Sequence, residues 1–306
     1  MIPNLVSVII VSFNTKDKLR TCLRAVEQIH EVIVVDNASK DGSVAMVKSD
    51  FPRVLLYESE SNLGFGAANN RGLDLASGEF ALFLNSDAYA KPGAIQILAD
   101  ELDDSTFVGA GGQLLNVDGS VQESTANRLT LWAVFCEQFM LEKAFKSNPF
   151  FSPYWTTLRH LQNFNESRGL VPTDQLMGAC LMIRRINERW PEKFDERYFL
   201  YCEDTDLCLR LQDHGQLGYW PPAEFTHELG SSSLNNRWLG VARYNRGKTL
   251  YFKIHHGALA ASICWVLNKL GATVRLLYWA IRSAMRVAKD PHANGQCGLF
   301  WRVLLD

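Results

Sequence analysis

The amino-acid sequence predicts a doubly wound α/β fold with a mostly parallel sheet and a helical extension at its C-terminal side. Apolar, β-branched runs alternate with helical segments through the first third of the 306-residue chain, which is the pattern of successive βαβ units. The last part of the chain changes character and contains an amphipathic helical pattern. We therefore expect one large domain over residues 1–240, with halves 1–112 and 113–240, and a helical segment over residues 241–306.

Strands and helices follow one another closely in the first half of this domain. Residues 5–13 (LVSVIIVSF) form a continuous apolar run, which is typical of a strand buried on both faces. Further strands are expected over residues 32–35, 54–57 and 80–84. Helices are expected from a cap at Asn14 or Thr15 to about residue 28, and over residues 43–48 and 66–76. Polar residues at the carboxyl ends of such strands, among them Asn14, Asp36 and Asp87, are expected to face a ligand.

The second half of the domain is less regular. Residues 113–172 have weak periodicity and many aromatic side chains, so we expect an insertion or loops over the site. These aromatic residues are interpreted mainly as core, with stacking on sugar rings as the alternative. From residue 173 the pattern indicates a strand (MGACLMIRR), a loop that leads into a helix (FDERYFLYCEDTDLCLRLQDHG), and a strand followed by a polar loop (LGYWPPAEFTHELGSSS).

Composition and charge exclude several classes of protein. A net charge of −2 creates no field that would attract nucleic acid. The seven cysteines are scattered and form no C-x-x-C pair, which argues against disulfide and zinc frameworks and favours a reducing cytosol. We see no secretion signal and no apolar run of the roughly 18 residues that a membrane span needs. A cytoplasmic protein is therefore expected.

The C-terminal helical pattern leaves two interpretations open. Between residues 265 and 289, Arg275, Arg282, Arg286 and Lys289 fall on one narrow helical face. Such a basic amphipathic helix can lie on an anionic membrane surface, here the inner face of the cell membrane. The alternative is a helix that packs on the domain with a solvated cationic face.

A candidate metal site lies after the strand at residues 80–84. Asp87 could bind Mg²⁺ or Mn²⁺, which prefer oxygen ligands and keep positions open for phosphate. His227, from a distant loop, could complete the coordination. Asn-Ser-Asp after a strand is also an ordinary turn sequence, so the tripeptide alone does not decide between the two.

A candidate nucleotide site involves Asp36 and the tract at residues 62–70. The Asp36 carboxylate can accept a hydrogen bond from the N3–H of uracil or thymine, although an Asx turn would use the same group. Residues 62–70 (NLGFGAANN) offer backbone amides and a helix N-terminus to a diphosphate. The tract superficially matches a dinucleotide fingerprint, but it does not follow the first strand, so a nicotinamide-dependent enzyme is the poorer hypothesis.

Three acidic residues begin the helix expected after residue 202. Asp206 is best explained as a structural residue near the positive end of that helix. Glu203 and Asp204, which follow an aromatic segment, are better placed to face a pocket, where a carboxylate could act as a general base.

Taken in order along the chain, these segments resemble the family 2 glycosyltransferases of the GT-A fold, and especially their bacterial rhamnosyltransferase-like branch. The resembling segments span roughly residues 5–230. They are VSVIIVSFNT, VIVVDNASKDGS, NLGFGAANNRG, FALFLNSDAY, MGACLMIRR, FDERYFLYCEDTDLCLRL and the loop at His227.

The resemblance implies an inverting displacement at the anomeric carbon of a nucleotide sugar. Within the Glu203–Asp204 pair it makes Asp204 the catalytic base, and it assigns the divalent cation, Mg²⁺ or Mn²⁺, to Asp87 and His227. The implied nucleotide-binding side chains are Asn14, Asp36, Asn70, Arg71, Asn85 and Ser86.

The chain departs from the family pattern at Asn85. The usual metal motif is Asp-x-Asp, whereas this chain has Asn85-Ser86-Asp87, so the first carboxylate is an amide that can bind a ribose hydroxyl but adds no charge. A non-catalytic nucleotide-sugar-binding protein on the same fold is therefore the alternative hypothesis. Within the resemblance the expected donor is deoxythymidine diphosphate rhamnose, and uridine diphosphate sugars stay open because both bases present the same N3–H. The expected acceptor is a glycan or a lipid-linked saccharide of cell-surface polysaccharide synthesis.

Overall fold

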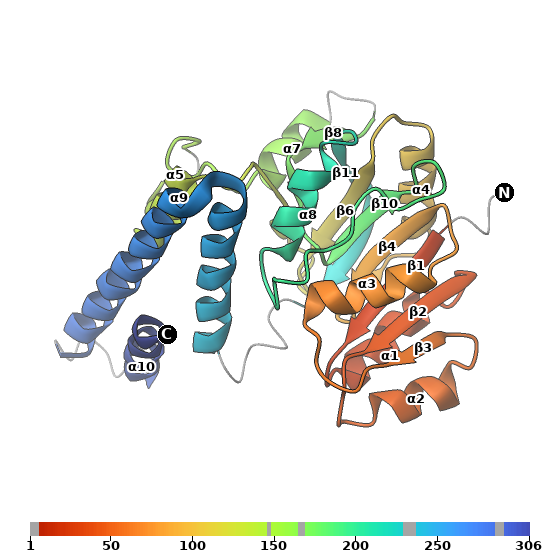
Figure 1. Ribbon diagram of the computed structural model, residues 1–306, viewed down its shortest axis with the longest axis horizontal. Helices are drawn as coiled ribbons and strands as arrows, with labels where there is room; N and C mark the ends of the chain where they lie inside the picture. Colours follow the sequence, from red (N-terminus) through yellow and green to blue (C-terminus); the bar gives the residue numbers. More distant parts are fainter. Residues whose placement is uncertain (1–5, 146–147, 165–168, 229–236, 285–290) are drawn as a thin grey trace. The chain divides into compact units, whose positions relative to one another are not determined.

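The computed structural model describes residues 6–145, 148–164, 169–228, 237–284 and 291–306, with the backbone alone described for residues 291–294. The chain divides into two compact units, and the sheet belongs to unit 1 (Figure 1). Unit 1 comprises Met1–Arg128, Trp155–Phe199 and Glu203–Ser232. Unit 2 comprises Leu129–Tyr154, Leu200–Cys202 and Ser233–Asp306, and its described part is helical.

The main sheet of unit 1 has the strand order β3-β2-β1-β4-β10-β6-β11-β5, and β8 also pairs with β11. Its first four strands are parallel: β1 (Val6–Ser12), β2 (Glu31–Asp36), β3 (Leu55–Glu58) and β4 (Phe80–Asn85). β10 (Cys180–Arg184) is antiparallel to β4 and β6 (Gly109–Leu115), and β11 (Leu217–His227) is parallel to β6 but antiparallel to β5 (Ala88–Ala90) and β8 (Val171–Thr173). The expected doubly wound, mostly parallel α/β class is confirmed.

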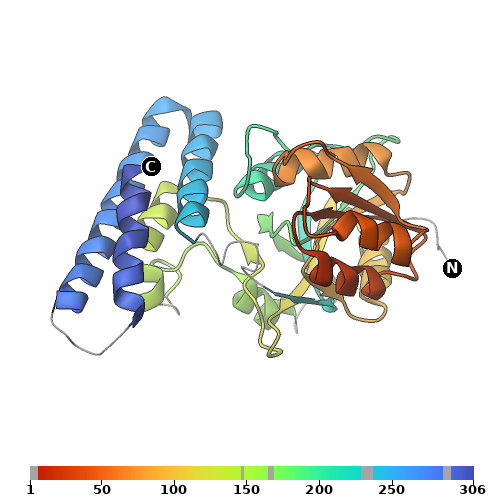
Figure 2. The same cartoon turned by 90° about the horizontal axis from the view of Figure 1, so that it is seen from below.

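Helices cover both faces of this sheet because side chains alternate along each strand. Val8 and Ile10 point into a core with α1 (Lys16–Ala25), α2 (Ser43–Asp50) and α4 (Ala94–Asp103). Ile9, between them, points into a second core with α3 (Phe65–Leu75) and α8 (Glu203–Leu211). Figure 2 shows α1 and α2 on one side of the sheet and α3 on the other. Burial on both faces explains why these strands appear in the sequence as uninterrupted apolar runs.

The segment over residues 113–172 contains more regular structure than the expected loops. Besides the end of β6 and the start of β8, its described residues hold one strand of a short two-stranded sheet and three helices. They are β7 (Thr125–Ala126), which pairs with β9 (Gln175–Leu176), and α5 (Leu131–Gln138), α6 (Leu141–Ala144) and α7 (Thr157–Phe164). Residues 129–154 group with the C-terminal helices in unit 2, which a single boundary at residue 240 does not anticipate.

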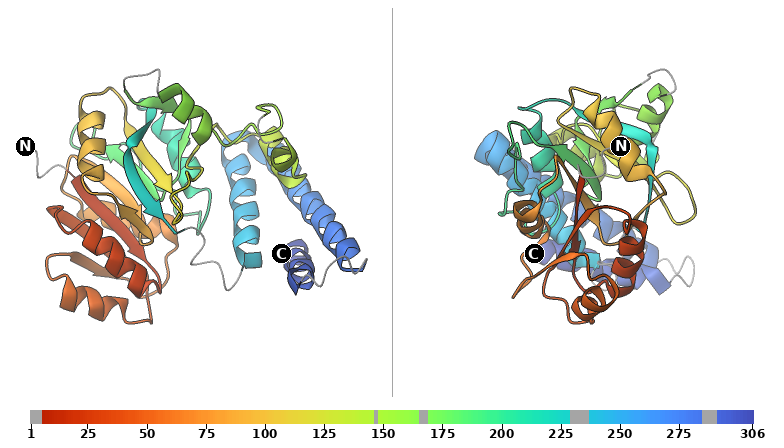
Figure 3. Two further views of the ribbon diagram at one scale, coloured as in Figure 1. Left: turned by 180° about the vertical axis from the view of Figure 1, so that it is seen from behind. Right: turned by 90° about the vertical axis from the view of Figure 1, so that its right-hand side faces the viewer.

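Unit 2 is built on α9 (Arg237–Ala284) and α10 (Pro291–Leu305). α9 folds back on itself at Gly257, whose φ of 83° and ψ of 177° are not helical (Figure 3). Asn268 on the second half donates to the Asn245 carbonyl on the first half at 3.2 Å, and its oxygen accepts from Gln138 of α5 at 3.0 Å. The buried Lys248 ammonium pairs with Glu137 of α5 at 2.6 Å. These polar bonds hold α5 and both halves of α9 together.

Two expectations about the C-terminal segment change. The sequence predicted no segment that is apolar enough to span a membrane, whereas α9 is long and apolar enough to do so by length and composition. One such helix does not establish a span. The expected free basic face is also wrong in part. Arg275 donates to the Gln138 side chain at 2.6 Å and to the Glu137 carbonyl at 2.7 Å, while Arg286 and Lys289 lie outside the described residues.

Candidate active site

Polar residues gather where the central parallel strands end. The register pairs Ser12 of β1 with Asp36 of β2, and Val11 of β1 with Asn85 of β4. The carboxyl ends of β1, β2 and β4 are therefore level with one another. In an open α/β sheet this is the edge at which ligands bind.

Asp36 has one carboxylate oxygen committed to the fold and one without a partner. Its Oδ1 accepts from the Ser39 N–H at 2.8 Å, which is the Asx-turn contact. Its Oδ2 is buried and has no hydrogen-bond partner in the part of the chain that the structure describes. The turn and the ligand-binding interpretations are therefore compatible, because each uses a different oxygen.

Asn14 shapes the loop beside Asp36. It adopts the left-handed conformation with φ of 55°, which asparagine tolerates better than most residues. Its Oδ1 accepts from the Lys40 N–H at 2.7 Å, and its own N–H donates to the Ser39 hydroxyl at 2.9 Å. The structure thus uses Asn14 to hold residues 39 and 40 next to the end of β1.

Asp87 and His227 lie together although they are far apart in the sequence. The antiparallel pairing of β11 with β5 sets His227 opposite Ala88, the neighbour of Asp87. The His227 Nε2 lies 3.4 Å from Asp87 Oδ1 and 3.4 Å from Asn85 Nδ2. Both Asp87 and His227 are buried, and Asn85 Oδ1 is a buried oxygen that has no hydrogen-bond partner among the described residues.

Gln122 determines which nitrogen of His227 carries the proton. The Gln122 amide nitrogen donates to the backbone carbonyl of His227 at 3.3 Å and to Asn116 Oδ1 at 2.9 Å, which fixes the orientation of the amide. Its carbonyl oxygen therefore faces the His227 Nδ1 at 2.7 Å and requires an N–H there. In the neutral ring the Nε2 lone pair is then directed toward Asp87 and Asn85, as a metal ligand requires.

These groups fit a hard divalent cation that also binds phosphate. The described residues contain no group of three or more His, Cys, Asp or Glu side chains that could hold a metal by themselves. Mg²⁺ and Mn²⁺ bound to a diphosphate need few protein ligands, because phosphate oxygens and water fill the other positions. Asp87 Oδ1, His227 Nε2 and the unpartnered Asn85 Oδ1 supply suitable ligand atoms.

Ser86, the middle residue of the Asn85-Ser86-Asp87 turn, contacts the loop that follows β1. Its hydroxyl accepts from the Thr15 hydroxyl at 3.0 Å, and the Thr15 hydroxyl also lies 3.0 Å from that of Ser12. This hydroxyl chain joins the ends of β1 and β4. Ser86 is buried, so it contributes to the shape of the site edge.

The glycine-rich tract brings the start of α3 against the loop that precedes α8. Gly64 has φ of 87°, and a Cβ at this position would lie 2.3 Å from the Phe199 carbonyl oxygen, so only glycine fits. The Phe65 N–H donates to that same oxygen at 2.9 Å. The first amide of α3 is therefore already bonded within the protein.

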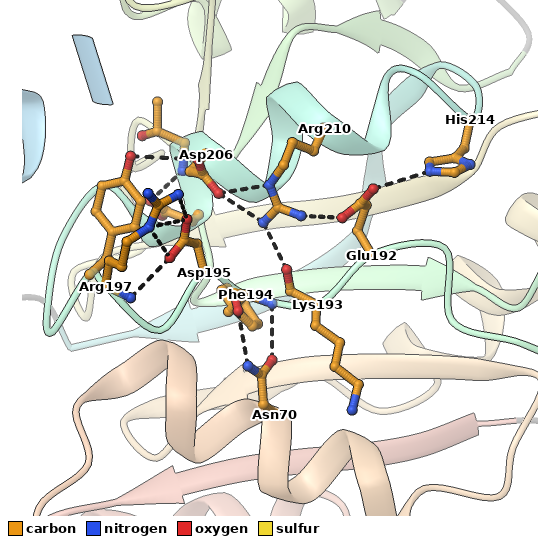
Figure 4. Close-up of polar contacts among 12 residues, drawn as sticks. Asn70, Glu192, Lys193, Phe194, Asp195, Arg197, Asp206, Arg210 and His214 are labelled. Atoms are coloured by element: carbon orange, nitrogen blue, oxygen red, sulfur yellow. Dashed lines mark hydrogen bonds and ion pairs between the residues drawn. The ribbon is translucent and has the colours of Figure 1, made fainter. Parts of the chain in front are cut away.

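Asn70 and Arg71 are placed differently. The Asn70 amide accepts from the Phe194 N–H and donates to the Phe194 carbonyl, both at 2.9 Å, and also donates to Glu196 (Figure 4). Arg71 is half-buried and makes no hydrogen bond or ion pair among the described residues. Of the two, Arg71 has the side chain that remains available to a phosphate.

Asp204 begins α8 beside a close backbone contact. Its Oδ2 accepts from the Gly178 N–H at 3.0 Å and its Oδ1 from the Thr205 N–H at 2.8 Å. The next carbonyl, of Ala179, accepts from the Asn85 N–H at 3.1 Å. Residues 178 and 179 therefore connect Asp204 to the turn that carries Asp87.

Burial shifts both acids at the start of α8. It raises the pKa of Asp204 above its usual value, against the lowering effect of the N–H groups of Gly178 and Thr205. It raises the pKa of Glu203 well above its usual value, and the neighbouring Asp204 charge adds to this. Glu203 Oε2 is also buried, and none of the described residues forms a hydrogen bond with it. A carboxyl with a raised pKa is a better proton acceptor at neutral pH than an ordinary aspartate, provided that it is ionised.

Asp206, in contrast, has a structural role. It is fully buried and pairs with Arg210 at 2.8 Å. Arg210 also contacts Glu192, which in turn lies near His214 (Figure 4). This network holds the loop before α8 in place.

Two buried residues of the site were not singled out by the sequence. Asn37 donates to Asn62 at 3.0 Å and to the Gly64 carbonyl at 3.1 Å, which ties the glycine-rich tract to the end of β2. Its position directly after Asp36 is the feature of the sequence that could have identified Asn37 as a site residue. Gln122 had no such signal, because it lies in the stretch with weak periodicity.

The chain is similar to known proteins in sequence and in fold. Residues 7–164 match the family described as glycosyl transferase family 2. The N-acetylglucosaminyl-diphospho-decaprenol L-rhamnosyltransferase of Mycobacterium tuberculosis is 30% identical over 276 residues, which cover 86% of this chain and 87% of that protein. The rhamnosyltransferase WbbL of Escherichia coli K12 is 26% identical over 72% of this chain and 81% of its own length.

Solved structures extend the likeness of the fold. A mannosyltransferase from Pyrobaculum calidifontis in complex with GDP-Man and Mn²⁺ superposes with a TM-score of 0.57 at 14% identity, covering 98% of this chain and 85% of that one. GalNAc-T7 with UDP, GalNAc and Mn²⁺ has a TM-score of 0.55 at 15% identity over 80% of this chain and 47% of its own. At these identities the likeness concerns the fold, which is of the GT-A type.

Proposed function

Because the chain belongs to glycosyl transferase family 2 and is a glycosyltransferase, we propose that it transfers rhamnose from a nucleoside diphosphate donor to a lipid-linked saccharide. The names of two relatives support the choice of sugar, since both are rhamnosyltransferases. The name of the mycobacterial relative also supports the acceptor class, because that protein acts on a diphospho-decaprenol lipid.

One observation carries the assignment of the catalytic residues. The base candidate Asp204 and the turn that bears Asp87 are bonded to the adjacent backbone groups of Gly178 and Ala179. These bonds support the proposal of a proton acceptor next to the groups that would hold the diphosphate. An inverting transferase requires the proton acceptor and the diphosphate site to lie close together. The reason is that the acceptor oxygen attacks the anomeric carbon on the face opposite the leaving diphosphate.

In the proposed reaction the ionised Asp204 accepts the proton of the acceptor hydroxyl. The hydroxyl oxygen forms a bond to the anomeric carbon, and the bond between that carbon and the diphosphate oxygen breaks with its electron pair on the diphosphate. A divalent cation held by Asp87, His227 and Asn85 would neutralise charge on the departing diphosphate. Arg71 is the cationic side chain proposed to contact the same group.

The base of the donor is proposed to be thymine or uracil. The unpartnered Asp36 Oδ2 is an acceptor that the N3–H of either base would satisfy. The amide of Asn85 is proposed to bind a ribose hydroxyl or the cation. Deoxythymidine diphosphate rhamnose is the preferred donor because the relatives are rhamnosyltransferases. The enzyme is proposed to act at the inner face of the cell membrane, where a lipid-linked acceptor would be presented.

Substitution of Asp204 by Asn tests the proposed mechanism. With deoxythymidine diphosphate rhamnose, Mn²⁺ and a polyprenyl-diphosphate-linked acceptor, we expect Asp204→Asn to lower kcat by about 10²- to 10⁴-fold, because the amide cannot take the proton. Nucleotide affinity should stay unchanged. Asp17→Asn, at an exposed carboxylate on α1, is the matched control.

The alternative of a non-catalytic binding protein, motivated by Asn85, has a distinct outcome. The unmodified protein would then bind the nucleotide in calorimetry and turn over no sugar with any acceptor. Undiminished turnover in Asp204→Asn would instead show that another group is the base.

A further inference from the structure

Unit 2 contains a cavity that the proposed reaction does not use. Its volume is about 260 Å³, and it lies between the two halves of α9 and the end of α10. Its wall on the first half of α9 is one helical face, because the lining residues are spaced three and four apart between residues 242 and 253. The second half contributes Trp265, Asn268 and Lys269, and α10 contributes Val303, with Asp306 directly after it.

The cavity is lined by three cationic side chains and one carboxylate. Arg246 pairs with the Asp306 carboxylate. Lys269 donates to the Leu304 carbonyl at 2.7 Å and lies 5.7 Å from the ring centre of Trp265. Lys253 is exposed, and no hydrogen bond or ion pair involves it within the described ranges. The excess of positive charge makes an anion the complementary ligand.

An exposed apolar stripe runs along the half of α9 that carries Trp265 and Lys269. Its members are spaced three or four residues apart and are each more than a third exposed: Leu259, Ile263, Val266, Leu270, Val274, Leu277 and Ile281. A continuous apolar stripe of this length on a water-facing helix marks an interaction surface. The same half of α9 carries Trp265 and Lys269 on the face that lines the cavity. An apolar stripe on a helix that also bears tryptophan and lysine has the character of helices that lie in a membrane interface.

The charge of α9 favours a lipid over a second copy of the chain as the partner that covers the apolar stripe. Within its 48 residues α9 carries eight lysine and arginine residues and no aspartate or glutamate. Two such helices face to face would repel each other, whereas an anionic bilayer surface attracts them. A phosphate-bearing lipid satisfies the cationic cavity and the apolar stripe together.

We propose that the cavity rimmed by Lys253, Lys269 and Trp265 binds the phosphate headgroup of a membrane lipid, while the apolar stripe of α9 contacts the acyl region. This inference deepens the proposed function. It rests on that function in one respect, namely that the acceptor is lipid-linked. The phosphate can belong to a bilayer phospholipid or to a polyprenyl diphosphate, and the two sources are separated by the test.

Vesicle co-sedimentation of the full chain provides the test. We compare vesicles of phosphatidylcholine alone, with phosphatidylglycerol, and with polyprenyl diphosphate. Lys253→Glu should weaken binding to the anionic vesicles about thirtyfold, because it removes one positive charge and adds one negative charge near the phosphate. Lys143→Glu, at an exposed lysine of unit 2 outside the cavity, should change binding far less.

A second pair of variants tests the stripe without touching the cavity. Leu259→Ser, at a side chain 77% exposed, should weaken binding to all vesicles that recruit the protein. Val117→Ser, at a side chain 73% exposed in unit 1, should leave binding unchanged. Recruitment by phosphatidylglycerol identifies bilayer lipid as the phosphate source, and recruitment by polyprenyl diphosphate alone identifies the acceptor class.

Several results would overturn the proposal. The first is binding to vesicles of phosphatidylcholine alone that equals binding to the anionic vesicles. The second is an equal effect of Lys253→Glu and Lys143→Glu on binding. The third is a protein that binds no vesicles but self-associates, and loses that self-association in Leu259→Ser. Hydrolysis of the nucleotide sugar without vesicles is measured in parallel. If vesicle binding depends on Lys253 but the protein turns over no sugar, the lipid site stands and the proposed function is wrong. If the protein turns over sugar but vesicle binding does not depend on Lys253, only the lipid site is wrong.

Discussion

At the residue scale, three buried oxygens stand out among the residues that the sequence had singled out. Asp36 Oδ2, Asn85 Oδ1 and Glu203 Oε2 have no hydrogen-bond partner in the described structure. Leaving a buried polar atom unpaired costs about 1–3 kcal/mol, so folded proteins leave few of them. The thymine or uracil of the donor is proposed to satisfy Asp36, and a cation or a ribose hydroxyl is proposed to satisfy Asn85. The site thus gives up some stability in order to bind.

Gln122 is predicted to control cation affinity through His227. Replacing Gln122 with Met removes the acceptor that holds the proton on Nδ1, so the ring can turn or change tautomer. We expect affinity for Mn²⁺ in the presence of uridine diphosphate to fall about tenfold to a hundredfold, as measured by electron paramagnetic resonance of free Mn²⁺.

Gln96→Met on the exposed face of α4 serves as the control for this prediction. Among the described residues its side chain hydrogen-bonds to Asp100 on the same helix, so Mn²⁺ affinity should stay at its original value. Equal affinities of the protein and its Gln122→Met variant would show that His227 does not need this partner.

Glu203 is predicted to make the folded unit less stable as the pH rises. Its pKa in the folded protein is raised well above 4.5, so the folded state binds more protons than the unfolded state between these two values. Its contribution to stability is present below the ordinary pKa and is lost as the pH rises through the raised one. In that window the free energy of unfolding should fall by up to about 1.4 kcal/mol per pH unit.

Glu203→Gln should remove this contribution, because an amide does not titrate. Urea unfolding of both proteins at a series of pH values from mildly acidic to mildly alkaline measures the difference. Asp204 shifts in the same direction and is present in both proteins, so the difference between the two curves measures Glu203 together with its coupling to Asp204. Parallel curves for the two proteins would contradict the assignment.

At the scale of elements, the turn at Gly257 converts one long helix into a pair. The residue joins two helical stretches with φ of 83° and ψ of 177°, a region that is almost restricted to glycine. The contacts of Asn245 with Asn268, and of Thr249 with Cys264, follow from that turn. The cavity proposed to bind a lipid phosphate exists only because the two halves face each other.

Gly257→Ala is therefore predicted to destabilise unit 2. No atom lies within 4 Å of the added Cβ, so the cost is conformational and should be about 1–3 kcal/mol. Gly298→Ala in α10, which also meets no atom within 4 Å but sits in a regular helix, should be neutral or stabilising by up to about 1 kcal/mol. Chemical denaturation followed by circular dichroism would distinguish them, and a similar effect of both substitutions would mean that the turn is not strained by a side chain.

At the scale of the whole molecule, the described structure separates a sheet unit that carries the proposed chemistry from a helical unit that carries the cationic cavity and the apolar stripe. Residues 129–154 belong to the helical unit although they lie between parts of the sheet unit in the sequence. Each unit buries its own polar contacts. Lys248 with Glu137 is such a contact in one unit, and Asp206 with Arg210 is one in the other.

Thermal unfolding with nucleoside diphosphates tests the donor assignment on the intact chain. With Mn²⁺ present, deoxythymidine and uridine diphosphates should raise the Tm by roughly 5–10 °C at a concentration a hundred times the Kd, because binding to the folded state stabilises it. Cytidine diphosphate should raise it less, since cytosine has no N3–H for Asp36. Asp36→Asn should reduce the distinction between the bases, and an equal shift with all three ligands would contradict the role of Asp36.

Much of the sheet unit could be predicted from local patterns. The strands at residues 6–12, 31–36 and 80–85 are apolar runs because they are buried on both faces, and that requirement is visible in a single segment. The same reasoning anticipated that Asp36 and the turn at residues 85–87 would lie at one edge, because parallel strands present their carboxyl ends on the same side.

What the sequence by itself determined, then, was the α/β class, the family resemblance and the identity of the candidate side chains. Only the tertiary structure decided how those side chains are used. The amide of Asn70 is committed to Phe194, one oxygen of Asp36 is free while the other closes a turn, and Gln122 fixes the proton on His227. Such bonds join positions far apart in the chain, so no local pattern of hydrophobicity or spacing specifies them. The same reason explains the fold of α9 at Gly257 and the internal role of Arg275, because a helical face is buried or exposed only once its neighbours are in place.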